Sequence, residues 1–103
     1  MHINFSKESL SDLNNIRNYI SYELQASMSA NKIISNILKS CNYLSQFPYL
    51  EKSLNAILNI QTNIKYIISN SYFIFYILDD DSIKIIRILS SKTNYLKIIT
   101  KYL

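Results

Sequence analysis

The stretch from Tyr72 to Leu89 reads YFIFYIL-DDDS-IKIIRIL and decides the fold of this chain. Two runs of seven residues, rich in β-branched and aromatic side chains, flank four turn-forming residues. This pattern predicts an antiparallel β-hairpin whose loop is Asp79 to Ser82.

The second strand of this hairpin carries two basic residues, Lys84 and Arg87. Their odd spacing predicts that they point to opposite faces of the sheet, because side chains alternate along a strand. On this alternation Arg87 shares a face with apolar residues, namely Ile83, Ile85 and Leu89. Its side chain either covers the edge of the sheet or is held there for a function.

Two helices are predicted before the hairpin. A short strand at His2–Phe5 is followed by Ser6, a suitable helix cap, and by residues at helical spacing that predict a first helix from Lys7 to Leu24: Leu10, Leu13, Ile16, Ile20 and Leu24. After the polar residues 25–29, a second apolar stripe predicts a helix that ends at Pro48: Ala30, Ile34, Ile37, Cys41 and Leu44. The two helices are expected to form an antiparallel hairpin.

The remaining segments complete an α+β layout. The apolar residues of 49–61 show no decisive helical or strand period, and this segment is expected to form a loop with at most one helical turn. The pattern at 64–69 predicts a strand, and a turn after it leads into the strand that begins at Tyr72. A terminal helix over 95–103 is expected to carry Lys97 and Lys101 outward. The predicted fold is a single domain over 1–103, strand, helix, helix, three-stranded meander and short helix, with the helices on one face of an antiparallel sheet.

Composition excludes several functional classes. The chain has no glycine, which excludes the glycine-rich phosphate loops of nucleotide-binding enzymes and leaves Asn70 and Asp79–Asp81 to adopt left-handed turns. One His and one Cys do not suffice for a metal centre, and no cofactor is expected. The single Cys41 and the short apolar runs indicate a soluble protein of a reducing cytoplasm, with no membrane span.

The net charge of +4 suggests an acidic partner, which could be a nucleic acid, an acidic protein segment or a membrane surface, or it reflects only a solvated surface. Basic and aromatic residues interleave in the second half of the chain: Lys65, Arg87, Lys92, Lys97 and Lys101 with Tyr66, Tyr72, Tyr76 and Tyr95. Such a set can bind RNA, but tyrosines are equally suited to the core and the sheet faces. Tyr95 follows a polar loop and is expected to be the most exposed.

Short motifs run in order along nearly the whole chain: Ile3-Asn4-Phe5-Ser6, Asp12-Leu13, Tyr19-Ile20, Leu44-x-x-Phe47-Pro48, Ile64-Lys65, Tyr72-x-Ile74-x-Tyr76 and Ile85-Ile86-Arg87-Ile88-Leu89. In order and spacing they resemble the RelE/ParE family of toxins from bacterial type II toxin-antitoxin modules. The resemblance implies a compact α+β fold, a cognate antitoxin that wraps and neutralises the protein, and growth arrest when the toxin is free.

The RelE-like branch of the family cleaves mRNA on the ribosome, and its key residues are not matched here. Where that branch has an arginine on the first hairpin strand this chain has Phe73, and where it has a His or Tyr after the last strand this chain has Ser90. The nearest candidates for catalysis are Lys65, Arg87, Lys92 and Tyr95. RNA cleavage lacks support without an arginine to stabilise the phosphorane and a group to move protons.

The ParE-like branch, which binds DNA gyrase without chemistry of its own, resembles the chain better in its two long helices and its Arg87-Ile88-Leu89 strand end. The resemblance implies that the residues that bind the target or the antitoxin are Lys65, Arg87, Ser90, Lys92 and Tyr95. Lysine at 65 and 92 replaces the usual arginine, which keeps the charge but weakens bidentate recognition. We therefore expect a cytoplasmic, plasmid-stabilising toxin in a toxin-antitoxin hetero-oligomer that inhibits gyrase. The alternatives are a RelE-like mRNA endoribonuclease that acts on the ribosome, and an inactive relic that only binds an antitoxin.

Overall fold

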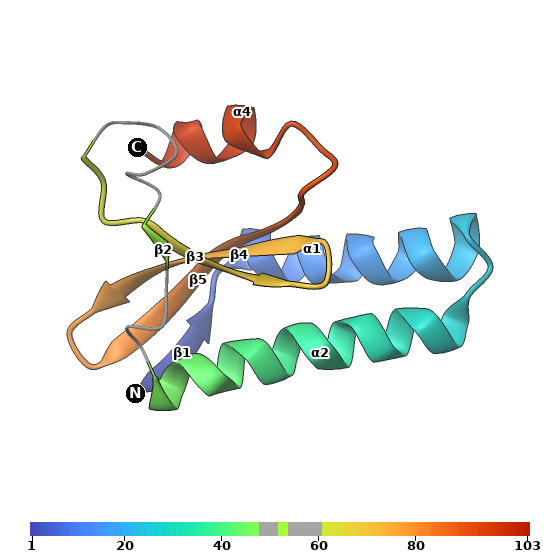
Figure 1. Ribbon diagram of the computed structural model, residues 1–103, viewed down its shortest axis with the longest axis horizontal. Coiled ribbons are helices and arrows are strands. Elements are labelled where there is room, and N and C mark those ends of the chain that lie inside the picture. The colour runs from blue at the N-terminus through green and yellow to red at the C-terminus, as the bar shows by residue number, and fades with distance from the viewer. Residues whose placement is uncertain (48–51, 54–60) are drawn as a thin grey trace.

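The computed structural model describes residues 1–47, 52–53 and 61–103. In chain order the elements are β1 His2–Phe5, α1 Lys7–Asn18, the π-helix η1 Tyr19–Glu23, α2 Ser27–Gln46, β2 Lys52–Ser53, β3 Lys65–Ser69, β4 Tyr72–Asp79, β5 Ser82–Ser90, α4 Tyr95–Ile99 and the 3₁₀ turn η2 Thr100–Tyr102. The predicted α+β order is confirmed, including the antiparallel pair of helices and the terminal helix (Figure 1).

The described strands form one sheet in the order β1-β5-β4-β3-β2. The meander from β3 to β5 is antiparallel as predicted, but β1 pairs with β5 in parallel, so the sheet is mixed rather than antiparallel. The parallel pairing is possible because the two helices carry the chain back before the meander begins.

The sheet lies between two helical layers (Figure 1). Side chains of α1 and α2, including Ile16, Ile34 and Ile37, share one buried cluster with Ile74, Tyr76 and Ile85 of the sheet. On the other face, Ile99 of α4 lies in a second buried cluster with Phe73, Phe75, Ile86 and Leu89. The prediction that all helices lie on one face is therefore wrong for α4, which covers the second apolar face of the central strands.

The apolar stripe predicted for the second helix is confirmed, whereas the one predicted for the first helix is only partly correct. All five predicted residues of α2 are buried, whereas Leu10 and Leu24, predicted on the stripe of the first helix, are exposed by 53% and 57%. The buried side of α1 consists instead of Ser9, Asp12 and Ile16, and Ile20 of η1 continues it. The π-helix rotates the register beyond residue 18, so the regular spacing on which Leu24 was assigned does not persist.

Because the chain has no glycine, its left-handed turn positions are occupied by other residues. Asn70 and Asp80 have φ of 55° and 50°, as predicted, and Gln25 between η1 and α2 also has a positive φ of 50°. Asn and Asp tolerate this region better than other residues that carry a Cβ, which makes Gln25 the strained member of the three.

Two predictions concern the segment after α2. Part of the predicted loop, Lys52–Ser53, is the short strand β2, which pairs with Tyr66 and Lys65 of β3. The rest of the predicted loop lies outside the described residues, at 49–51 and 54–60. The predicted end of the second helix at Pro48 lies outside them as well. Where the chain is described, no helix has the length and apolarity needed to span a bilayer.

A β-bulge corrects the predicted placement of Arg87. The β4–β5 register shifts between Phe75, opposite Arg87, and Tyr76, opposite Ile85, which leaves Ile86 as the extra residue. Arg87 therefore shares the α4 face with Phe75 and Leu89 rather than the face of Ile83 and Ile85. Lys84 lies opposite Ile77 on that same α4 face, so the prediction that the two basic residues point to opposite faces is wrong.

Candidate functional site

Arg87 forms a two-pronged ion pair with Asp12 of α1. Its Nε donates to Asp12 Oδ2 and its Nη2 donates to Asp12 Oδ1, both at 2.8 Å. The Asp12 side chain is 9% exposed and that of Arg87 is 20% exposed. The hydrogen bonds to Asp12 raise the pKa of Arg87 above its ordinary value, and burial opposes this only in part, so the guanidinium stays charged. Paired bonds of this geometry are among the stronger polar contacts in proteins.

The same carboxylate closes an edge of the sheet. Strand β1 pairs with β5 only as far as Ile85, and α1 begins immediately beyond β1. There the buried backbone N–H of Ile88 donates to Asp12 Oδ2 at 2.9 Å, and Ser6, the N-cap of α1, donates its hydroxyl to the carbonyl of Ile86. Asp12 thus accepts the hydrogen bond of a backbone N–H of β5 that β1 is too short to reach.

Arg87 also contacts the end of the chain. Its Nη1 donates to the Tyr102 hydroxyl at 3.4 Å, and the guanidinium carbon lies 5.9 Å from the centre of the Tyr102 ring. Arg87 therefore links α1, β5 and η2. Asp12 was not among the predicted site residues, although an acidic residue in register with Ile16 and Ile20 was a sign that a cation lay opposite.

The other predicted site residues are dispersed. Lys65 lies opposite Tyr76, on the sheet face of the two long helices, whereas Arg87 belongs to the α4 face. Ser90 is engaged in the turn after β5: its Oγ accepts from the backbone N–H of Lys92 at 3.1 Å, and its carbonyl accepts from the Thr93 hydroxyl. Lys92 itself is exposed. The structure therefore does not gather Lys65, Arg87 and Lys92 at one place.

Tyr95 is not the exposed residue that the sequence suggested. Its ring centre lies 4.3 Å from that of Phe73 and 6.3 Å from that of Phe75. Phe73, which stands where the mRNA-cleaving branch has an arginine, is 8% exposed. The remaining predicted aromatics are also structural: Tyr66 and Tyr76 are buried, and Tyr72 packs against the cluster of α1 and α2 that contains Tyr76. Partial burial, with Tyr19 nearby, raises the pKa of Tyr72. On the other face, Tyr66, Phe73, Phe75 and Tyr95 hold α4 and the sheet together.

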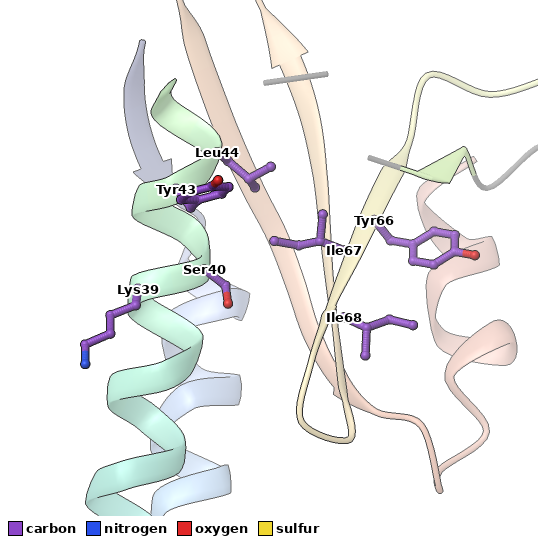
Figure 2. A pocket seen from close by; sticks show the side chains of 7 residues that line it. All are labelled: Lys39, Ser40, Tyr43, Leu44, Tyr66, Ile67 and Ile68. Carbon is purple, nitrogen blue, oxygen red and sulfur yellow. The ribbon is translucent and has the colours of Figure 1, made fainter. Parts of the chain in front are cut away.

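A hollow lies between α2 and β3 (Figure 2). It has a volume of about 520 Å³ and is lined by Lys39, Ser40, Tyr43 and Leu44 of α2 and by Tyr66, Ile67 and Ile68 of β3. Figure 2 shows Leu44 and Ile67 directed toward each other across it, while Lys39 points outward at the rim. A second hollow, about 410 Å³ in volume, adjoins α2 and includes Arg17, Leu38 and Lys39.

Two features give the α2–β3 hollow the character of a protein-binding surface. Tyr43, a large side chain that lines the hollow, is 52% exposed. The whole of α2 carries two lysines, Lys32 and Lys39, and no acidic residue. Exposed apolar surface beside a helix that carries two lysines and no acidic residue suits an acidic amphipathic partner. Within the described residues no three His, Cys, Asp or Glu side chains converge as they would around a metal ion.

Comparison with known proteins agrees with this architecture. A chain of the solved structure described as the chromosomal ParDE toxin-antitoxin system from P. aeruginosa superposes with a TM-score of 0.73 at 15% sequence identity, over 87% of this chain and 95% of that one. None of the curated proteins matches in sequence. The family model described as ParE toxin of type II toxin-antitoxin system, parDE, matches residues 3–95. The chain accordingly belongs to the ParE toxin family of type II toxin-antitoxin systems.

Proposed function

We propose that this ParE-family protein is a cytoplasmic toxin that acts by binding DNA gyrase, and that a cognate antitoxin neutralises it in a hetero-oligomer. The observation that carries the proposal is the dispersal of the groups that RNA cleavage would need together. Arg87 is paired with Asp12, Lys65 belongs to the opposite face of the sheet, and Phe73 is buried. A protein whose charged groups are engaged or scattered is better suited to binding than to proton transfer.

The α2–β3 hollow is the surface that we assign to the antitoxin. Its apolar lining, its exposed Tyr43 and the helix α2, which carries no acidic residue, favour an amphipathic antitoxin segment whose polar side is acidic. The P. aeruginosa structure, described as a ParDE system, supports the same kind of partnership for this chain.

Two variants test the docking surface. Tyr43→Glu introduces a like charge for an acidic partner on the α2 side of the hollow, and Leu10→Glu introduces the same charge on α1, at a side chain that is similarly exposed, 53% against 52% for Tyr43. Tyr43→Glu is expected to weaken antitoxin binding at least about tenfold, or ~1.4 kcal/mol, measured by titration calorimetry. Leu10→Glu is expected to bind within about threefold of the wild type. Equal losses in both variants, or no loss in either, would place the antitoxin elsewhere.

Expression in bacteria tests the toxin itself. The chain expressed alone should arrest growth, and co-expression with the product of the adjacent gene should restore it. Unimpaired growth at high expression, together with a tight antitoxin complex, would identify an inactive relic. Cleavage of mRNA on translating ribosomes, with gyrase unaffected, would identify a RelE-like nuclease.

A further inference from the structure

The excess positive charge of the chain is concentrated at its C-terminal end. From Ser82 to Leu103 there are five basic residues and no Asp or Glu: Lys84, Arg87, Lys92, Lys97 and Lys101. Residues 1–81 contain the other six basic residues and all seven acidic ones, so that part is nearly neutral. The net charge of +4 thus belongs to β5 and the segment that follows it.

Three of these lysines are exposed on the segment that follows β5. Tyr95, Leu96, Ile98 and Ile99 pack toward the second apolar cluster, which leaves Lys97 and Lys101 exposed about one helical turn apart. Lys92 is exposed in the preceding loop. None of the three forms an ion pair with any carboxylate in the part of the chain that is described.

The loop that carries Lys92 is anchored by hydrogen bonds. The backbone N–H of Ser91 donates to the carbonyl of Ser71 at 2.7 Å, and the backbone N–H of Thr93 donates to the carbonyl of Ser90 at 3.2 Å. Lys92 and the lysines of α4 and η2 are therefore presented by an ordered unit that is docked on the sheet.

This surface differs in kind from the hollow beside α2. Its exposed residues from 91 to 101 are all polar, namely Ser91, Lys92, Thr93, Asn94, Lys97, Thr100 and Lys101, and exposed apolar side chains follow only at Tyr102 and Leu103. Protein–protein interfaces are depleted in lysine and depend on buried apolar anchors, which this stretch does not offer. Phosphate oxygens, in contrast, are bound by lysine, serine, threonine and asparagine without any apolar contact.

We propose that the surface formed by Lys92, Lys97 and Lys101 binds the phosphate backbone of double-stranded DNA, without sequence preference. In the setting of the proposed function, it would contact the DNA on which gyrase acts while other surfaces bind the enzyme. The DNA contact itself does not depend on gyrase and can be measured without it.

The test is fluorescence anisotropy of a labelled duplex of about 20 base pairs, titrated with the full-length chain over a range of salt concentrations starting near 50 mM. Lys97→Gln/Lys101→Gln removes two charges from the proposed surface, and Lys7→Gln/Lys32→Gln removes one exposed charge from each of the two long helices. The first pair is expected to weaken DNA binding at least about tenfold and to reduce the slope of log affinity against log salt by about 1.8. The second pair should change affinity less than about threefold and leave the slope unaltered.

Equal losses in the two double variants would mean that net charge alone is responsible and would overturn the proposal. Binding to poly-glutamate but not to the duplex at the same salt concentration would assign the surface to an acidic protein instead. Specific loss of DNA binding in Lys97→Gln/Lys101→Gln would support the DNA surface even if gyrase proved not to be the target. Inhibition of gyrase by a chain that shows no DNA binding would support the target and refute this surface.

Discussion

The Asp12–Arg87 pair should be a major contributor to stability, and Asp12→Ala is the perturbation that measures it. The substitution removes three hydrogen bonds: two from the guanidinium of Arg87 at 2.8 Å and one from the backbone N–H of Ile88 at 2.9 Å. Bonds to charged groups contribute about 1.5–3 kcal/mol each, and a buried donor left without an acceptor costs about 1–3 kcal/mol.

These values are not additive, because Arg87 is 20% exposed and can turn its freed guanidinium toward water. We expect a loss of about 3 kcal/mol in the free energy of unfolding, which for a chain of this size corresponds to a fall of roughly 12 °C in Tm. Asp12→Asn retains one side-chain oxygen as an acceptor and should cost about half as much. Asp81→Asn, an exposed carboxylate in the hairpin turn, is the matched control and should change stability by less than about 0.5 kcal/mol.

A double-mutant cycle with Arg87→Ala isolates the pair. Urea unfolding of the wild type, Asp12→Ala, Arg87→Ala and the double variant should give a coupling energy of about 1.5–2.5 kcal/mol. Additive effects, with coupling below about 0.5 kcal/mol, would refute the conclusion that these side chains stabilise each other. A substitution of Arg87 that abolishes function must therefore be examined for unfolding before Arg87 is assigned to a binding site.

Three further predictions concern individual residues. Ser6→Ala removes the cap that accepts from the Ser9 N–H at 3.0 Å and should cost about 1–2 kcal/mol of unfolding free energy in urea titrations; no change would refute the role of the cap. Gln25→Gly should stabilise by about 0.5–1 kcal/mol by relieving a positive φ, and Asn70→Gly by less; the reverse order would contradict the assigned strain. Burial raises the pKa of the Cys41 thiol from 9.0 to about 12, so the folded chain holds this proton more tightly than the unfolded chain and stability falls as pH rises above 9. Between pH 8.5 and 10 the loss should be about 1.2 kcal/mol and should be absent in Cys41→Ala; an identical pH profile in that variant would exclude Cys41 as the cause.

Local chemistry made much of the fold predictable. The β4–β5 hairpin follows from two apolar runs around a turn-forming quartet, and the α2 stripe follows from five apolar residues at helical spacing. Both depend on neighbours in the sequence. The positive φ at Asn70 and Asp80 was predictable for the same reason, because a chain without glycine must use these residue types in tight turns.

The predictions that failed depend on tertiary structure. A single extra residue, Ile86, moves Arg87 to the other face of the sheet. The spacing of apolar residues along the strand does not predict this bulge. The placement of α4 on the second face follows from the fact that β4 is apolar on both sides, with Phe73 and Phe75 on one and Ile74 and Tyr76 on the other. That pattern was present in the sequence and predicts two covering layers.

The candidate site was the least predictable part because its residues have several possible partners. The sequence showed that Arg87 was unusual among apolar neighbours, but its partner lies 75 positions away. The family comparison covers 3–95 and includes both residues of the pair, yet it does not distinguish a structural arginine from one that binds the target.

Inhibition of DNA gyrase tests the central claim most directly. The purified chain, titrated into a supercoiling reaction, is expected to block the reaction at concentrations comparable to that of the enzyme, and equimolar antitoxin is expected to restore it. The same preparation, added to translating ribosomes, should leave mRNA intact. Undiminished supercoiling at a large excess of folded protein, together with cleaved mRNA, would contradict the account.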